Sequence, residues 1–113
     1  PKTLKAQVHV LGLYSKNNKE AIEQEIERKL EGDELYSAYF LGDKKELYLL
    51  EKVKSSPHKL AAYDSEMRSA ARANPSVFFK QNGEARSFVE IKAEMKRRYL
   101  QMPKSFTIAG YTP

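Results

Sequence analysis

Two histidines, His9 and His58, are the side chains of this chain best suited to acid–base chemistry near neutral pH. His9 falls on the polar phase of an alternating segment, so we expect it to point away from a core. His58 lies in the first turn of an expected helix, where the helix dipole favours the neutral imidazole. Neither has a second histidine four residues away, the spacing of a helical metal site. We therefore interpret both as structural or solvated residues.

Carboxylates gather at two places that look like turns. These are Glu31, Asp33 and Glu34 in one place, and Asp43 and Glu46 in the other. Paired carboxylates act as acid and base, or hold magnesium, only where burial separates their pKa values or fixes their geometry. Because all five are expected in turns, we interpret them as solvated charges.

The motifs of phosphate-binding loops and nucleophile elbows are absent from the sequence, and so is cysteine. We therefore predict no catalytic residue, no metal site and no cofactor, and the sequence favours a non-enzymatic protein.

Positive charge is concentrated in the second half of the chain. Residues 1–53 hold 9 Lys/Arg and 10 Asp/Glu, whereas residues 54–113 hold 11 and 5. A basic half favours acidic partners, of which nucleic acid is the commonest.

Two groups of cations could provide the contacts. Lys92, Lys96, Arg97 and Arg98 fall on one expected helix, which could lie along a phosphate backbone. Lys80 and Arg86 flank a turn just before that helix, where two cations and free backbone N–H groups could form an anion pocket.

Aromatic residues form a third candidate surface. Tyr36, Tyr39, Phe40 and Tyr48 fall in one expected hairpin, and rings on an open sheet face can stack on bases. Residues 45–52 lack the glycine and the aromatic positions of the RNA-recognition motif, so that family is rejected. We favour instead a position of these rings in the core or in an interface with a second copy of the protein.

The first half of the chain reads as a strand, a helix and a hairpin. Apolar and polar residues alternate over residues 4–10. A helix follows, opened by the capping-box pair Asn17 and Glu20 and ended by Gly32. The segments 34–41 and 46–53, rich in leucine and aromatic residues, are predicted to pair as a hairpin across Gly42-Asp43.

A second helix is predicted from Ser56-Pro57 to Asn74-Pro75, because proline suits the first helical position and cannot continue a helix. Its predicted buried stripe comprises Leu60, Tyr63, Met67, Ala70 and Ala71. Residues 77–79 are expected to form a strand that ends at the turn Asn82-Gly83.

Residues 84–90 fit either a returning hairpin strand or the start of a helix. We favour a helix to about residue 101, because Ser87 and Glu90 have capping-box spacing and apolar residues recur every three or four positions. Residues 106–111 are expected to form a last strand.

The predicted order over residues 4–81, β-α-β-β-α-β, is that of the ferredoxin-like fold, an antiparallel sheet with helices on one face. The helix and strand over residues 87–111 would extend this core. A chain of 113 residues fits one domain, and no segment has the roughly 20 apolar residues of a membrane helix. We therefore predict a single α+β domain over residues 1–113, located in the cytoplasm, with no membrane contact.

The leading functional prediction is a small non-enzymatic protein whose basic C-terminal half binds nucleic acid, with RNA and DNA not distinguished. The alternative is a protein-interaction module, acting as a regulator, inhibitor or assembly subunit through the open sheet face or the edge strand at residues 106–108. A homodimer is compatible with both.

Overall fold

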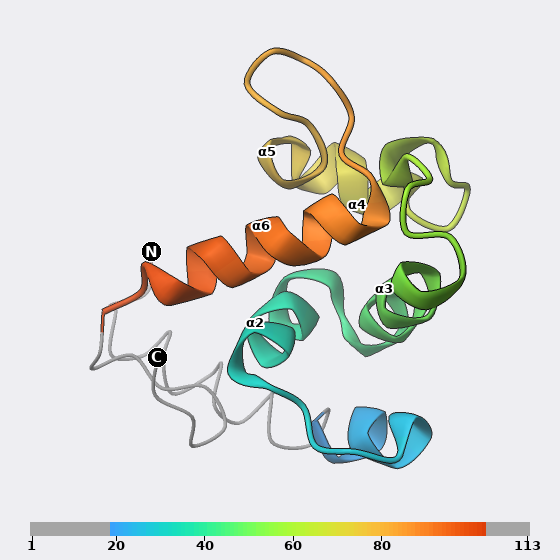
Figure 1. Cartoon of the computed structure of the whole chain (residues 1–113), viewed down its shortest axis with the longest axis vertical. Coiled ribbons are helices and arrows are strands. Elements are labelled where there is room, and N and C mark those ends of the chain that lie inside the picture. Colours follow the sequence, from blue (N-terminus) through green and yellow to red (C-terminus); the bar gives the residue numbers. More distant parts are fainter. Residues whose placement is uncertain (1–18, 104–113) are drawn as a thin grey trace.

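The computed structural model describes residues 19–103, and the part of the chain that it describes is helical (Figure 1). Residues 19–26 are helical and are followed by α2 (Gly32–Leu41), α3 (Asp43–Ser55) and the short 3-10 helix η1 (Ala61–Tyr63). Then come α4 (Arg68–Ala73), α5 (Pro75–Phe78) and α6 (Phe88–Leu100). None of the described helices is long and apolar enough to cross a membrane.

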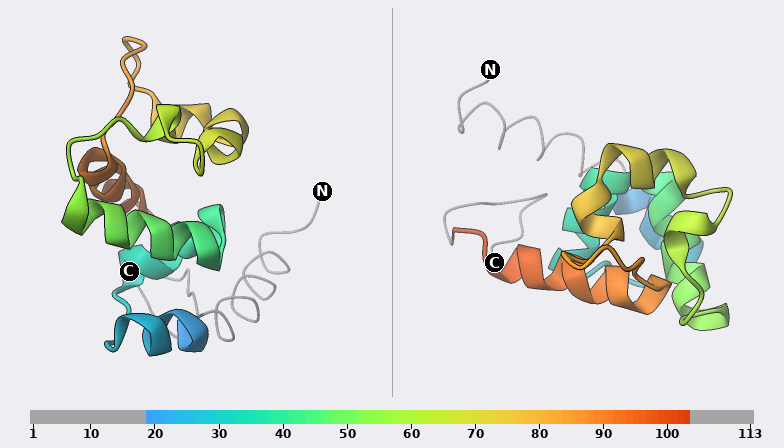
Figure 2. Two further views of the ribbon diagram at one scale, coloured as in Figure 1. Left: turned by 90° about the vertical axis from the view of Figure 1, so that its right-hand side faces the viewer. Right: turned by 90° about the horizontal axis from the view of Figure 1, so that it is seen from above.

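Helices α2, α3 and α6 contact one another pairwise and form the centre of the molecule. Residues 19–26 lie beneath them, and η1, α4 and α5 form a further layer that contacts α6 through α5 (Figures 1 and 2). The larger apolar cluster joins the central helices α2, α3 and α6 to the layer of η1, α4 and α5. It comprises Leu41, Leu49, Ala61, Ala62, Met67, Ala70, Ala71, Val77, Phe78, Phe88, Ile91 and Met95.

The predicted α+β, ferredoxin-like fold is wrong, because the described residues contain no sheet and only two isolated β-bridges. The predicted hairpin is instead the helix pair α2 and α3. Aromatic residues are enriched in strands, but leucine is a good helix former, and the buried positions follow a helical period. Glu46, Leu49 and Leu50 are buried, which is helical spacing.

Gly42 lies at the corner between these helices and not in a hairpin turn. Its φ of 85° is in the left-handed region, where glycine carries no Cβ penalty. It ends α2, donating its N–H to the carbonyl of Ala38 at 2.7 Å, and precedes the first residue of α3. A glycine followed by an aspartate therefore marks a helix–helix corner.

The first predicted helix is present over residues 19–26, but it ends before the expected Gly32. Glu27 has a left-handed φ of 58° and interrupts the helix. Gly32 is the first residue of α2, where a Cβ would overlap the phenol of Tyr99. This glycine therefore permits a close approach of α6. The first strand, residues 4–10, lies outside the described residues.

The second predicted helix is only partly present, as η1 and α4. The residues before η1 form a turn that lies against the start of α6: the N–H groups of Phe88 and Val89 donate to the carbonyls of Lys59 and Pro57, both at 3.0 Å. The carboxylate of Asp64 then accepts the N–H of Glu66 at 3.0 Å, a local bond that competes with helix continuation. The chain becomes α-helical again at Arg68.

The predicted strand at residues 77–79 is also wrong, because Pro75–Phe78 form α5 with the proline at the start of the helix. A single antiparallel bridge joins Phe79 to Ala85 across the turn at Gly83, whose φ is 89°. The turn at Asn82-Gly83 and the helix predicted after it are therefore both present. The helix is confirmed as α6, whereas the strand predicted at residues 106–111 lies outside the described residues.

Candidate functional site

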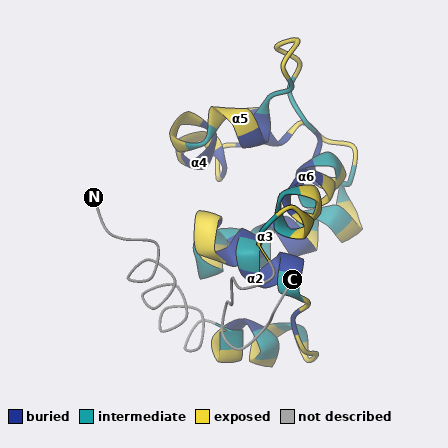
Figure 3. Ribbon diagram, turned by 90° about the vertical axis from the view of Figure 1, so that its left-hand side faces the viewer, coloured by how far each residue is buried: buried dark blue, intermediate teal, exposed yellow. Residues whose placement is uncertain are grey.

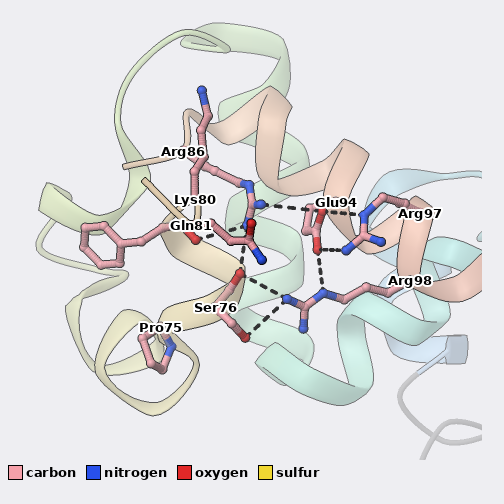
Figure 4. Close-up of a pocket in the computed structure, with 9 residues that line it drawn as sticks. Pro75, Ser76, Lys80, Gln81, Arg86, Glu94, Arg97 and Arg98 are labelled. Carbon is pink, nitrogen blue, oxygen red and sulfur yellow. Dashed lines mark hydrogen bonds and ion pairs between the residues drawn. The ribbon is translucent and has the colours of Figure 1, made fainter. Parts of the chain in front are cut away.

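Two groups of cations that are separate in the sequence meet at one pocket. Lys80 and Arg86 lie on the loop between α5 and α6, and Arg97 and Arg98 lie in the last turns of α6 (Figure 4). The pocket has a volume of about 740 Å³. The other residues that line it are Pro75, Ser76, Phe79, Gln81 and Glu94.

The carboxylate of Glu94 lies among the three arginines that line this pocket, and its side chain is only 8% exposed. Arg97 Nε donates to it at 2.9 Å and Arg98 Nε at 2.7 Å, while Arg86 Nη2 lies 3.6 Å away (Figure 4). Hydrogen bonds from Arg97 and then Arg98 outweigh burial and lower the pKa of Glu94 to about 2. One ionised carboxylate thus faces three guanidinium groups, which leaves two positive charges beside it.

The arginines differ in what else they bind. Arg86 Nη1 donates to the carbonyls of Ser76 and Val77, at 2.8 and 2.9 Å, and so satisfies carbonyl groups that a helix end leaves unpaired. Arg98 Nη2 donates to the carbonyl and hydroxyl oxygens of Ser76, at 3.0 and 3.2 Å. These two side chains fasten α5 and the following loop to α6 and form the inner wall of the pocket.

Arg97 and Lys80 are the accessible cations of the group, with side chains 55% and 40% exposed. Lys80 lies 3.1 Å from the carboxylate of Glu90, which also accepts the N–H of Ser87 at 2.8 Å. That backbone bond and Lys80 lower the pKa of Glu90 to about 2. Arg97 is thus the cation of the Glu94 group that an external anion reaches most readily.

The start of α6 does not offer the free N–H groups that the sequence suggested. The N–H of Ser87 is bound by Glu90, and that of Glu90 by the Ser87 hydroxyl at 3.3 Å, which is the predicted capping box. The N–H groups of Phe88 and Val89 are bound to backbone carbonyls. The surplus positive charge therefore comes from side chains farther along the helix.

Lys92 and Lys96 do not line the pocket. Lys92 Nζ lies 3.2 Å from Glu34 and 3.6 Å from Asp33, on the side of α6 that faces α2. Arg28 binds Glu34 through two bonds of 2.8 Å. Burial would raise the pKa of Glu34, but Arg28, the Glu31 N–H and Lys92 together lower it to about 2. Lys96 is exposed on α6.

The interpretation of the acidic residues as solvated is wrong for three of them, since Asp33, Glu34 and Glu46 are all buried. Glu46 accepts the hydroxyl of Ser37 at 2.6 Å, and burial raises its pKa to about 8. These residues join α2, α3 and α6. Among the described residues, no three potential metal ligands lie close enough together to hold an ion.

The predicted aromatic surface is divided between two helices and does not border the pocket. On α2, the rings of Tyr36, Tyr39 and Phe40 lie against one another, with centroid distances of 5.0 and 5.8 Å. On α3, the Tyr48 hydroxyl donates to the buried carboxylate of Asp64 at 2.8 Å. Burial and this carboxylate raise the pKa of Tyr48 to about 12.

His58 is exposed in the turn after α3, and His9 lies outside the described residues. Sequence reasoning missed Glu94 and Ser76 as parts of the site. Glu94 could have been found, because it precedes Arg97 by three residues and Arg98 by four, the spacing of helical ion pairs. The sequence gives no such indication for Ser76, because Ser76 lies on α5 and binds Arg98 on α6, far away along the chain.

The sequence matches no known protein-family model and no curated protein.

Proposed function

We propose that this protein binds nucleic acid and that the pocket around Glu94 holds a backbone phosphate. The observation that supports this proposal is the charge of the pocket, where three guanidinium groups share one carboxylate. The surplus charge comes from arginine side chains that hydrogen bonds hold in place. Such a site is organised before the anion arrives, so little side-chain entropy is lost on binding.

Arginine suits this role because its planar guanidinium can donate two parallel hydrogen bonds to phosphate oxygens. Arg97 has its Nε and Nη2 directed at Glu94 and Nη1 at Gln101, with half of the side chain exposed. A phosphate would bind at its exposed edge and at Lys80. Arg86 and Arg98 would keep their bonds to Glu94 and Ser76 and would attract the phosphate by their positive charge without contacting it.

A protein-interaction role is the second candidate, although the sheet face suggested for it is absent from the described residues. The observation in its favour is the ring cluster on α2, where Tyr39 and Phe40 are 40% and 38% exposed. We also propose a cytoplasmic location, since a chain without cysteine suits a reducing compartment.

Fluorescence anisotropy with labelled single-stranded RNA, single-stranded DNA and duplex DNA tests the first proposal. The variant Lys80→Gln/Arg97→Gln removes the two accessible cations while leaving Arg86, Arg98 and Glu94 in place. We expect weaker binding and a shallower dependence of log K on log salt, by about 0.7–0.9 for each phosphate that the variant no longer neutralises.

The control is Lys29→Gln/Lys54→Gln, which removes two exposed charges from the turn before α2 and from the end of α3. It lowers the net charge by the same amount, so it should reproduce only the general electrostatic effect. Equal reductions in affinity for the two double variants, or no salt-sensitive binding by the unmodified protein, would overturn the proposal.

A further inference from the structure

A second pocket adjoins the first on the layer formed by η1, α4 and α5. It has a volume of about 570 Å³ and shares Pro75 and Phe79 with the pocket around Glu94. Its other lining residues are Ala62, Tyr63, Arg68, Ala71 and Arg72. Two arginines and no carboxylate are among them, so this pocket continues the basic surface.

Tyr63 is the most exposed aromatic residue among the large exposed hydrophobic side chains of the described part, at 63%. It was predicted to face the core, but the 3-10 turn of η1 directs it outward. Its ring stands edge-on to that of Phe79, with centroids 6.5 Å apart and planes at 75°. Phe79 thus supports the tyrosine without covering it face to face.

Arg68 and Arg72 are exposed and one turn apart on α4, so they share one face of that helix. Figure 3 shows exposed residues on both α4 and α5. An exposed aromatic ring and two arginines thus line one pocket, which adjoins the pocket around Glu94 and combines a stacking surface with two sites of positive charge.

We infer that this second pocket receives an unpaired base of single-stranded nucleic acid, which stacks on Tyr63 while flanking phosphates contact Arg68, Arg72 and the pocket around Glu94. The inference rests on the proposed function and specifies its substrate. In a duplex, base faces are covered by neighbouring base pairs, so an aromatic ring can reach them only where the strand is unpaired. The chemistry therefore favours a single strand over a duplex.

The sequence contains no tryptophan, so Tyr63→Trp introduces a single fluorescent reporter at the proposed stacking position. Titration with a single-stranded oligonucleotide should quench this tryptophan, because stacking on a base quenches indole fluorescence. An abasic strand of equal length and charge should bind through its phosphates without comparable quenching. A tryptophan placed at Tyr39, on α2, is the matched control and should respond to neither strand.

Affinity measurements on two further variants complete the test. Tyr63→Leu removes the ring and should weaken single-strand binding by about tenfold without changing the salt slope, whereas Tyr63→Phe should bind like the unmodified protein. Because Tyr63 is exposed, both variants should keep the circular dichroism spectrum of the parent.

The two proposals fail in distinguishable ways. Salt-sensitive binding that is equal for normal and abasic strands, or stronger for duplex, would overturn the stacking inference and leave the phosphate pocket intact. Absence of binding to every nucleic acid would overturn both proposals. Quenching confined to strands that carry bases, with weaker binding by Tyr63→Leu, would support the inference.

Discussion

The two sides of α6 differ in the balance between positive and negative side chains. On the side facing α2, Lys92 and Arg28 meet the buried carboxylates of Asp33 and Glu34, so two cations face two anions. On the side facing α5, a single carboxylate, Glu94, meets three guanidinium groups. The same basic helix therefore carries a balanced cluster on one side and a surplus of positive charge on the other.

This difference shows that charge counted along a sequence does not locate a surplus of positive charge on the folded protein. Lys92 and Arg97 contribute equally to the net charge, but Lys92 is 31% exposed against two buried acids, and Arg97 is 55% exposed at the edge of a pocket. Balanced pairs hold helices together, whereas a surplus held in place by hydrogen bonds attracts an external anion.

The largest effect on stability is expected when the carboxylate that binds the cations is removed, Glu94 on one side of α6 and Glu34 on the other. Glu94→Gln leaves three guanidinium groups without their anion, so we expect the free energy of unfolding to fall by about 3 kcal/mol. Sulfate should restore part of that stability relative to chloride at equal ionic strength, because it can replace the missing negative charge. Urea unfolding in the two salts measures both effects.

Glu34→Gln is the matched change on the balanced side. It should also destabilise the fold, but with less recovery in sulfate, since Asp33 still faces Lys92 and the half-exposed Arg28 can turn into water. Equal recovery in the two variants would contradict the contrast between the sides.

Glu46→Gln should change the pH dependence of the α2–α3 junction. With a pKa of about 8, folded Glu46 keeps a proton that the unfolded chain releases above about pH 4.5, so stability should fall as pH rises from about 4.5 to 8. Glutamine cannot ionise and can still accept the Ser37 hydroxyl. The variant should therefore be more stable than the parent at pH 8, with a much smaller difference at pH 5.

The pKa of Glu94 is lowered, so its contribution has the opposite sign: it is complete above about pH 4.5 and disappears as pH falls toward 2. Urea unfolding at several pH values separates these effects. A flat profile for the parent between pH 5 and 8 would show that Glu46 is ionised when folded.

Ser76→Ala should have the smallest effect. It removes the hydroxyl bond with Arg98, but the carbonyl bond to the same side chain remains. We expect the free energy of unfolding to fall by no more than about 1 kcal/mol in urea unfolding, with unchanged oligonucleotide affinity. A large fall in affinity would mean that the hydroxyl itself contacts the ligand.

The sequence predicted α6 because its start has the Ser87–Glu90 capping box and its apolar residues keep a helical period. The prediction was wrong for α2 and α3. There the buried face includes the charged residue Glu46, which interrupts the apolar pattern of a helix, and the aromatic residues are of types common in strands. Four of the six cations predicted from the sequence line the pocket around Glu94. That Arg86 joins Arg97 and Arg98 around Glu94, and that Arg98 binds Ser76, was not predictable, because both contacts depend on how α5 and the loop after it pack against α6.

The most direct test compares Arg97→Gln with Lys92→Gln, two single-charge changes on opposite sides of α6, in the salt dependence of single-stranded oligonucleotide binding. We predict that Arg97→Gln lowers the slope of log K against log salt by about 0.7, the value for one phosphate contact on a single strand, and that Lys92→Gln leaves it unchanged. Equal slopes for the two variants would contradict the central claim, because they would mean that only net charge matters.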